Sequence, residues 1–131
     1  NEVEFINDSK ATNIDSVIVA INTYKQPIVL ILGGFNKGAN FRLLLPHIKS
    51  SHVRDIVSYG DAGGQINTAL GDAVRSVQVT DLSSAVKKAQ LMAAPGDIVL
   101  LSPGCASYDE FSNFEERGNH FKSIIKSLAA S

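Results

Sequence analysis

The sequence has few of the residues on which disulfide-rich and metal-binding proteins depend. Its 131 residues include one cysteine, Cys105, no tryptophan and only three histidines. A single cysteine excludes an internal disulfide and fits a reducing compartment. The histidines, His47, His52 and His120, are scattered and lack the spacing of metal ligands. We therefore expect neither a disulfide-stabilised domain nor a metal centre.

Long hydrophobic runs and an excess of charge of one sign are also missing. The longest apolar runs, residues 28–32 and 98–101, are far shorter than the roughly 20 residues that span a bilayer. The sequence does not start with the basic and apolar stretches of a secretory signal. A net charge of −1 gives no electrostatic case for nucleic acid or a membrane surface as a partner. We expect a cytoplasmic protein of one domain.

What the sequence does contain is an alternation of two periodicities. Short β-branched segments bounded by turn residues predict strands at 3–7, 28–33, 53–59, 76–79 and 98–101. Apolar residues at helical spacing predict helices over 14–21, 41–48, 82–89 and 121–128, with a weaker one near 65–70. Asn13, Asn40 and Asp81 stand at N-cap positions. The alternation predicts one doubly wound α/β domain over residues 1–131, with a mostly parallel sheet of about five or six strands and helices on both faces.

In such a sheet, ligands bind at the carboxyl ends of the strands, so we expect the binding residues in the loops there. The loop after the first strand, residues 7–13, is polar at six of its seven positions. Helix capping accounts for Thr12 or Asn13. It does not account for Lys10, whose charge is unfavourable near a helix N-terminus unless an anion is bound there. A capped helix start and an anion site both remain open.

The loop after the second strand is rich in glycine. Gly33 and Gly38 have the spacing of a phosphate-binding loop, but Ala39 and Asn40 replace its lysine and its serine or threonine. A Walker A loop is therefore excluded, and no dinucleotide-binding glycine motif is present. Lys37 is either solvated or a binder of carboxylate or phosphate, and spacing alone does not decide between the two.

The loop after the fifth strand, residues 102–118, combines small residues, hydroxyls and aromatics. This composition suggests a pocket wall with available backbone donors. Because no histidine pairs with Cys105, we expect a small buried thiol rather than a nucleophile. Asp109 and Glu110 are expected to be solvated rather than a catalytic pair. The residues alone lead to an α/β ligand-binding domain with polar loops at one edge.

Taken together, the three loops resemble the Mur ligase family, and within it the members that add D-glutamate. The matching segments are Asn-Asp-Ser-Lys-Ala-Thr-Asn at 7–13, Gly-Gly-x-x-Lys at 33–37, Leu-Ser-Pro-x-Cys-Ala-Ser-x-Asp-x-Phe at 101–111 and Asn-Phe-Glu-x-Arg-Gly at 113–118. The resemblance implies a Rossmann-like C-terminal domain of an ATP-dependent, amide-forming ligase of peptidoglycan precursor synthesis. ATP would convert the carboxyl group of UDP-N-acetylmuramoyl-L-alanine into an acyl phosphate, which the amine of D-glutamate attacks.

The resemblance also implies which groups meet the nucleotide. Asp8 would contact the ribose hydroxyls, and Lys10 would be the catalytic group near the phosphates or the acyl phosphate. ATP and Mg²⁺ would be bound mainly by a central ATPase domain that lies, like a UDP-binding N-terminal domain, outside this sequence. This domain would contact those two domains within a monomeric enzyme. The chain as given is expected not to catalyse ligation.

For the amino acid, the resemblance implies two groups of donors. Thr12 and Lys37 would bind one carboxylate of D-glutamate. Ser107 and the backbone at Phe114 would hold the other. Tyr108 departs from the family pattern, in which an aliphatic residue is common at this position, and would reshape the rim of the pocket. A dianionic amino acid needs such separated donors, because they fix its orientation beside the electrophile.

Two other functions remain alternatives. A sister ligase would use another acceptor, such as L-alanine, a diamino acid, a dipeptide or a folate-linked glutamate. The Asp-Asn-Pro-Arg signature of the diamino-acid enzymes is not found here. The second alternative is a stand-alone, non-catalytic module that binds a nucleotide or an amino acid.

Overall fold

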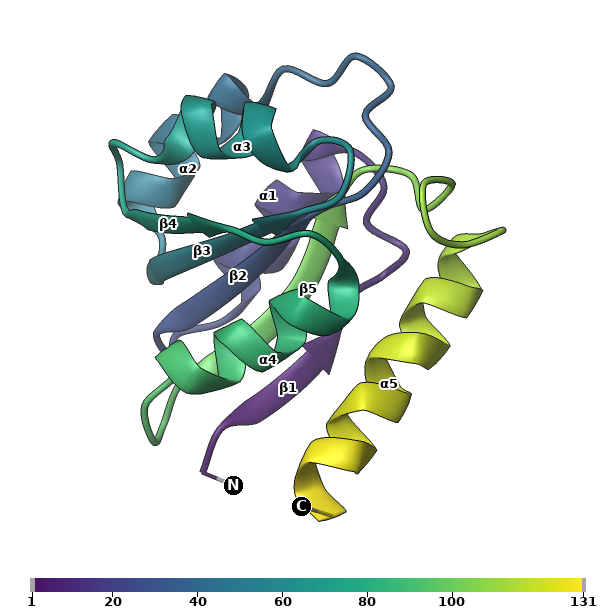
Figure 1. The fold of residues 1–131 in the computed structure, drawn as a ribbon. Coiled ribbons are helices and arrows are strands. Elements are labelled where there is room, and N and C mark those ends of the chain that lie inside the picture. Colours follow the sequence, from purple (N-terminus) through teal and green to yellow (C-terminus); the bar gives the residue numbers. More distant parts are fainter. Residues whose placement is uncertain (1, 131) are drawn as a thin grey trace.

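Five parallel strands form the centre of the fold in the computed structural model (Figure 1). The structure describes residues 2–130, except for the side chain of residue 130. Every pair of neighbouring strands is parallel, and the strand order is β1-β5-β2-β3-β4. The predicted α/β fold is therefore confirmed, with five strands. The strands are β1 (Glu4–Asn7), β2 (Ile28–Gly33), β3 (Val53–Tyr59), β4 (Arg75–Gln78) and β5 (Ile98–Gly104).

Helices cover both faces of this sheet (Figure 1). They are α1 (Ile14–Thr23), the 3₁₀ helix η1 (Phe41–Leu44), α2 (Leu45–Ser50), α3 (Gly63–Leu70), α4 (Leu82–Met92) and α5 (Phe114–Ala130). The apolar side chains of α1, η1, α2 and α3 pack in one core cluster, and those of α4 and α5 pack in a second. Strand β2 serves both cores, because Leu30 and Leu32 face the first and Val29 and Ile31 face the second. Its continuous apolar sequence follows from this burial on both sides.

Two of the predicted helices differ from those in the structure. The helix predicted over 41–48 is divided, because η1 ends at Leu44 and α2 begins at Leu45 with Pro46 in its first turn. Proline has no N–H to donate and is tolerated only in the first turn of a helix. The C-terminal helix was predicted from 121, but α5 begins at Phe114, so the end of the third polar segment is helical.

The predicted N-caps are confirmed. The side chain of Asn13 accepts a hydrogen bond from the N–H of Ser16, and that of Asp81 accepts one from Ser84. Asn40 caps η1 in the same way. Each cap ends the loop that follows a strand and so fixes where that loop enters its helix. None of the helices described between residues 2 and 130 is long and apolar enough to cross a membrane.

Candidate ligand-binding site at the carboxyl edge of the sheet

The loops after β1, β2 and β5 are joined by backbone hydrogen bonds at the carboxyl edge of the sheet. The N–H of Gly104 donates to the carbonyl of Ala11 at 2.8 Å, joining the β5 and β1 loops. The N–H of Phe35 donates to the carbonyl of Ala106, also at 2.8 Å, joining the β2 and β5 loops. Because β5 lies between β1 and β2 in the sheet, its loop can contact both neighbours.

Thr12 and Lys37 line one pocket of about 500 Å³ between the start of α1 and the β2 loop, here called the Thr12–Lys37 pocket. The backbone at 104–106 also lines it. The N-terminus of α1 carries a partial positive charge, so hydroxyl, ammonium and helix end can act together on a carboxylate. Asp15, in the first turn of α1, lines the same pocket. The pocket is therefore lined by one ammonium group and one carboxylate.

Two further predicted residues lie in the β5 loop beside this pocket. Ser107 is buried, with an exposed fraction of 3%. Tyr108 is exposed, and its ring centroid lies 6.0 Å from Nζ of Lys37, within the range of a cation–π contact. Tyr108 thus stands next to one of the residues lining the pocket, whereas Ser107 is not among those residues.

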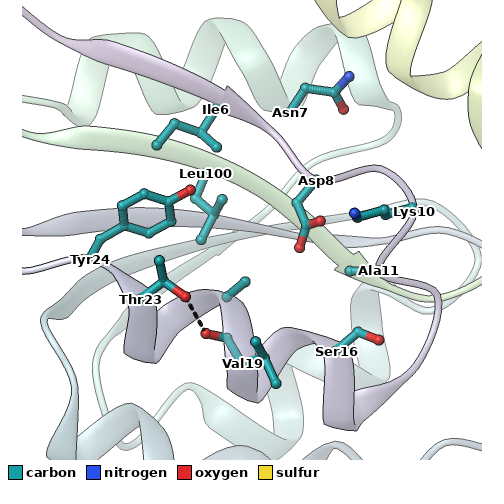
Figure 2. A pocket seen from close by; sticks show the side chains of 11 residues that line it. Ile6, Asn7, Asp8, Lys10, Ala11, Ser16, Val19, Thr23, Tyr24 and Leu100 are labelled. Atoms are coloured by element: carbon teal, nitrogen blue, oxygen red, sulfur yellow. Dashed lines mark hydrogen bonds between the residues drawn. The ribbon is translucent and has the colours of Figure 1, made fainter.

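A second pocket, of about 490 Å³, extends from Asp8 and Lys10 to Tyr24, and Figure 2 shows it from close by. The carboxylate of Asp8 and the amine of Lys10 point toward one another at one end of this Asp8–Tyr24 pocket (Figure 2). Oδ2 of Asp8 accepts a hydrogen bond of 3.0 Å from the hydroxyl of Ser102. A fixed carboxylate can accept hydrogen bonds from sugar hydroxyls, and an exposed lysine can bind phosphate, so these residues fit part of a nucleotide.

A third pocket, of about 320 Å³, is lined by Lys10, Phe114 and Lys122 and is called the Lys10–Phe114 pocket. The carbonyl of Phe114 is already engaged, because it accepts a 2.7 Å hydrogen bond from the hydroxyl of Ser9. Phe114 is the first residue of α5, where backbone N–H groups lack partners within the helix. Its N–H is therefore the backbone group suited to an anionic ligand.

The structure thus distributes the predicted site residues over adjacent pockets. Thr12 and Lys37 share one pocket, and Lys10 and Phe114 share another. Lys10 also lines the Asp8–Tyr24 pocket, so it connects the candidate nucleotide and amino-acid regions. Among residues 2–130, no three His, Cys, Asp or Glu side chains gather in a way that could hold a metal ion.

Arg117 is the residue at this edge to which the sequence assigned no role. It lies in α5 with an exposed fraction of 0%. Its guanidinium group donates three hydrogen bonds: Nε to Oγ of Ser9 at 2.9 Å, Nη2 to the carbonyl of Ser9 at 2.8 Å, and Nη1 to the carbonyl of Cys105 at 3.0 Å. The available signal was spacing, because Arg117 precedes Phe121 and Ile124 at i+4 and i+7 on the buried face of α5.

Cys105 and the two neighbouring carboxylates have structural contacts. The Cys105 side chain is buried, as predicted, and burial raises the pKa of its thiol to about 12. Asp109 accepts a hydrogen bond from the N–H of Asp61, and Glu110 accepts one from the N–H of Leu82. Both residues are exposed, as predicted, and these hydrogen bonds also attach the β5 loop to its neighbours. Burial also raises the pKa of Glu110.

The structure defines a doubly wound α/β domain whose polar loops converge at the carboxyl edge of the sheet, the edge at which domains of this class bind their ligands. The chain belongs to the Mur ligase, glutamate ligase domain family, which matches residues 1–105. It is 45% identical over 128 residues to the UDP-N-acetylmuramoylalanine–D-glutamate ligase of Chlamydia caviae, covering 98% of this chain and 30% of that protein. The ligase of the same name from Desulfatibacillum aliphaticivorans is 41% identical over 129 residues, covering 98% of this chain and 28% of that protein.

The chain therefore spans about 30% of the length of these curated relatives. Among solved structures, a ligase domain from Haemophilus ducreyi matches 93% of this chain and 88% of its own. With 12% identity and a TM-score of 0.44, that likeness is too distant to bear on function.

Proposed function

We propose that this chain is the C-terminal, amino-acid-binding domain of an ATP-dependent ligase that joins D-glutamate to UDP-N-acetylmuramoyl-L-alanine in the cytoplasm. The observation that carries the proposal is the meeting of Thr12, Lys37 and the N-terminus of α1 in one pocket. The names of the relatives support D-glutamate as the amino acid. The enzyme would act in peptidoglycan precursor synthesis, as a monomer that includes a central ATPase domain and an N-terminal UDP-binding domain.

In this proposal the domain orients D-glutamate by its two carboxylates. Lys37 neutralises one carboxylate while the hydroxyl of Thr12 fixes its direction, and Tyr108 packs beside Lys37 at the rim. The second carboxylate is held by the hydroxyl of Ser107 and the backbone N–H of Phe114. Two separate attachments leave the amine as the free end of the ligand, directed at the electrophile.

Asp8 and Lys10 serve the other reactant. Asp8, held by Ser102, accepts hydrogen bonds from the ribose hydroxyls of ATP, and Lys10 reaches the phosphates. ATP would supply the γ-phosphoryl group that converts the substrate's carboxylate into an acyl phosphate, with ADP released, and Mg²⁺ would neutralise the phosphate charge. As the neutral amine attacks the acyl carbon, the C–N bond forms, the amine gives up a proton to solvent, and the acyl–oxygen bond breaks with phosphate as the leaving group. The ammonium of Lys10, between the two pockets, stabilises the negative charge that develops there.

The test uses the full-length ligase and follows ADP release with UDP-N-acetylmuramoyl-L-alanine, ATP and Mg²⁺. D-Glutamate, L-glutamate and a diamino acid are compared as acceptors. The Lys37→Ala variant is compared with Lys49→Ala, which removes an exposed lysine from α2. We expect release that depends on D-glutamate, is lost or strongly weakened in Lys37→Ala, and is retained in Lys49→Ala.

The other outcomes identify the alternatives. Release that depends on the diamino acid would move the chain to a sister ligase. No release with any acceptor would leave a binding module without catalysis. The isolated chain of residues 1–131 is expected to show no ATP turnover, and turnover by it would contradict the proposed division of work between domains.

A further inference from the structure

Within the part of the chain that the structure describes, Arg117 is a buried cation without a carboxylate partner. Its exposed fraction is 0%, and the ion pairs found among residues 2–130 join Arg54 and Arg75 to Asp55 and Asp97 instead. Removing a charge from water is costly unless hydrogen bonds replace its hydration. An apolar side chain would fill the same space in α5 without that cost. The position therefore calls for an explanation beyond packing.

The contacts of Arg117 explain why a buried cation stands at this position, because they join it to the polar loops from the interior of the domain. Two of its nitrogens bind Ser9 in the β1 loop, and a third binds the carbonyl of Cys105 in the β5 loop. A Cβ placed on Gly34 of the β2 loop would lie 3.1 Å from Nη1, so that loop packs directly against the guanidinium. One side chain thus contacts all three loops of the carboxyl edge.

The residues that Arg117 contacts are close in sequence to the residues proposed to bind the ligands. Ser9 is preceded by Asp8 and followed by Lys10, and Cys105 lines the Thr12–Lys37 pocket two residues before Ser107. The Ser9 hydroxyl accepts from Arg117 and donates to the carbonyl of Phe114, which continues the connection to the start of α5.

The direction of the carbonyl groups matters as much as their position. The carbonyl oxygens of Ser9 and Cys105 are hydrogen-bonded to a fully buried group, so they face the interior. A carbonyl oxygen turned to the surface would place partial negative charge beside a dianionic ligand. Arg117 therefore fixes the loops in a conformation that keeps these acceptors away from the ligand.

We propose that Arg117 is a positioning residue for amino-acid binding: it holds the β1 and β5 loops at the separation and orientation that D-glutamate requires. It contacts no ligand itself. The inference rests on the proposed function, and it goes beyond it by assigning the geometry of the site to a residue beneath the surface. A merely structural Arg117 would change the amount of folded enzyme and leave the KM for D-glutamate unchanged.

The test measures the KM for D-glutamate in the full-length ligase, at saturating ATP and UDP-N-acetylmuramoyl-L-alanine. Arg117→Ala is expected to raise this KM about tenfold or more, since a factor of ten corresponds to the loss of roughly one well-placed interaction. Ser9→Ala keeps the buried charge and removes only the hydroxyl that joins Arg117 to Phe114. It is expected to raise the KM for D-glutamate by a smaller factor. If Arg117→Ala does not fold, Ser9→Ala alone tests the proposal.

Ile124→Ala is the matched control. Ile124 is buried on the same helix two turns further on and packs in the second core cluster with Phe121. Its truncation is expected to lower the urea midpoint of unfolding while the KM for D-glutamate stays at the wild-type value.

The possible outcomes separate the two proposals. If the wild-type enzyme releases ADP with D-glutamate but Arg117→Ala and Ser9→Ala keep its KM, the positioning role is wrong and the proposed function stands. The positioning role is equally wrong if Ile124→Ala raises the KM as much as Arg117→Ala does. If the wild-type enzyme itself shows no D-glutamate-dependent release, the proposed function fails, and the inference fails with it.

Discussion

The hydroxyl of Ser102 donates a 3.0 Å hydrogen bond to the carboxylate of Asp8, connecting strand β5 to the loop after its neighbour β1. Ser102 is completely buried, whereas Asp8 is half-buried and lines the Asp8–Tyr24 pocket. The bond therefore holds the carboxylate from the inside while its other lone pairs remain available to a ligand. Fixing the acceptor before binding reduces the entropy that a nucleotide would otherwise lose in ordering it.

Ser102→Ala should weaken binding of ATP to the full-length enzyme. Losing one hydrogen bond to a charged group is expected to raise the KM for ATP about three- to tenfold, with a smaller effect on the KM for D-glutamate. Steady-state ADP release provides both values. Ser58→Ala is the control, because Ser58 is equally buried on β3 and lines none of the three pockets. Equal values of the KM for ATP in all three proteins would show that Ser102 does not orient Asp8.

Gly34→Ala should destabilise the fold more than Gly38→Ala, although both glycines have a positive φ in the same loop. At Gly34, with φ +124°, a Cβ would lie 2.4 Å from the carbonyl oxygen of Ala106. The backbone bond between Phe35 and Ala106 would then have to move. At Gly38, with φ +89°, no atom beyond the adjacent residues lies within 4 Å of a Cβ, so only the backbone conformation is strained.

Urea unfolding of the chain measures this difference. We expect a loss of about 1–2 kcal/mol for Gly38→Ala, the cost of a left-handed conformation in an L-residue. Gly34→Ala adds the backbone clash and should lose about 3 kcal/mol or more. Equal losses would mean that the β2 loop can move away from the β5 loop, contrary to the tight junction in the structure.

The sequence predicted the elements whose signals are local. Strand β2 was expected at its observed bounds, because burial on both faces requires the continuous apolar run from Ile28. The caps at Asn13 and Asp81 were found because a capping side chain bonds a backbone group only three residues away. The start of α5 was missed, because its first turns carry polar residues that contact loops rather than the apolar core.

The site could be predicted as three loops but not as pockets. Which loops share a pocket depends on strand order, and the sequence does not give the position of β5 between β1 and β2. Nothing in the residue pattern alone joins Thr12 to Lys37; the family resemblance assigned both to one carboxylate, and in the structure both line one pocket. The role of Arg117 depends on contacts with residues 108 positions away, which no local pattern reveals.

Cys105 should resist thiol reagents while the chain is folded. Burial raises the pKa of its thiol to about 12, although the charge of Arg117 acts in the opposite direction. At pH 8 the folded protein therefore has very little of the reactive thiolate, and access is also blocked. A chromogenic disulfide reagent should react slowly with the native chain and completely after unfolding in urea. Rapid labelling of the native chain would contradict the closed packing of the β5 loop.

Asp55 should make folding stability depend on pH in the acidic range. Burial alone would raise the pKa of its carboxyl group. Hydrogen bonds from Arg75 and Arg54, together with their charges, outweigh burial and hold the pKa below its ordinary value of 3.8. A carboxyl group whose pKa is lower in the folded state stabilises the fold above its unfolded pKa. That stability is lost as the pH falls through the folded pKa.

Asp55→Asn is therefore expected to lower the free energy of unfolding by about 1–2 kcal/mol at pH 7, a modest value because both arginines are partly exposed to solvent. The difference from the wild-type chain should shrink as the pH falls below 3.8, because protonation then removes the same charge from Asp55. Urea unfolding at a series of pH values measures both effects. Asp72→Asn, at an exposed position between α3 and β4, controls for the general loss of a carboxylate and should change stability little. The free energies of unfolding of Asp55→Asn and of the wild-type chain could instead differ by the same amount from pH 7 to pH 3. The loss would then come from poorer packing of the amide, and the charge of Asp55 would contribute nothing to stability.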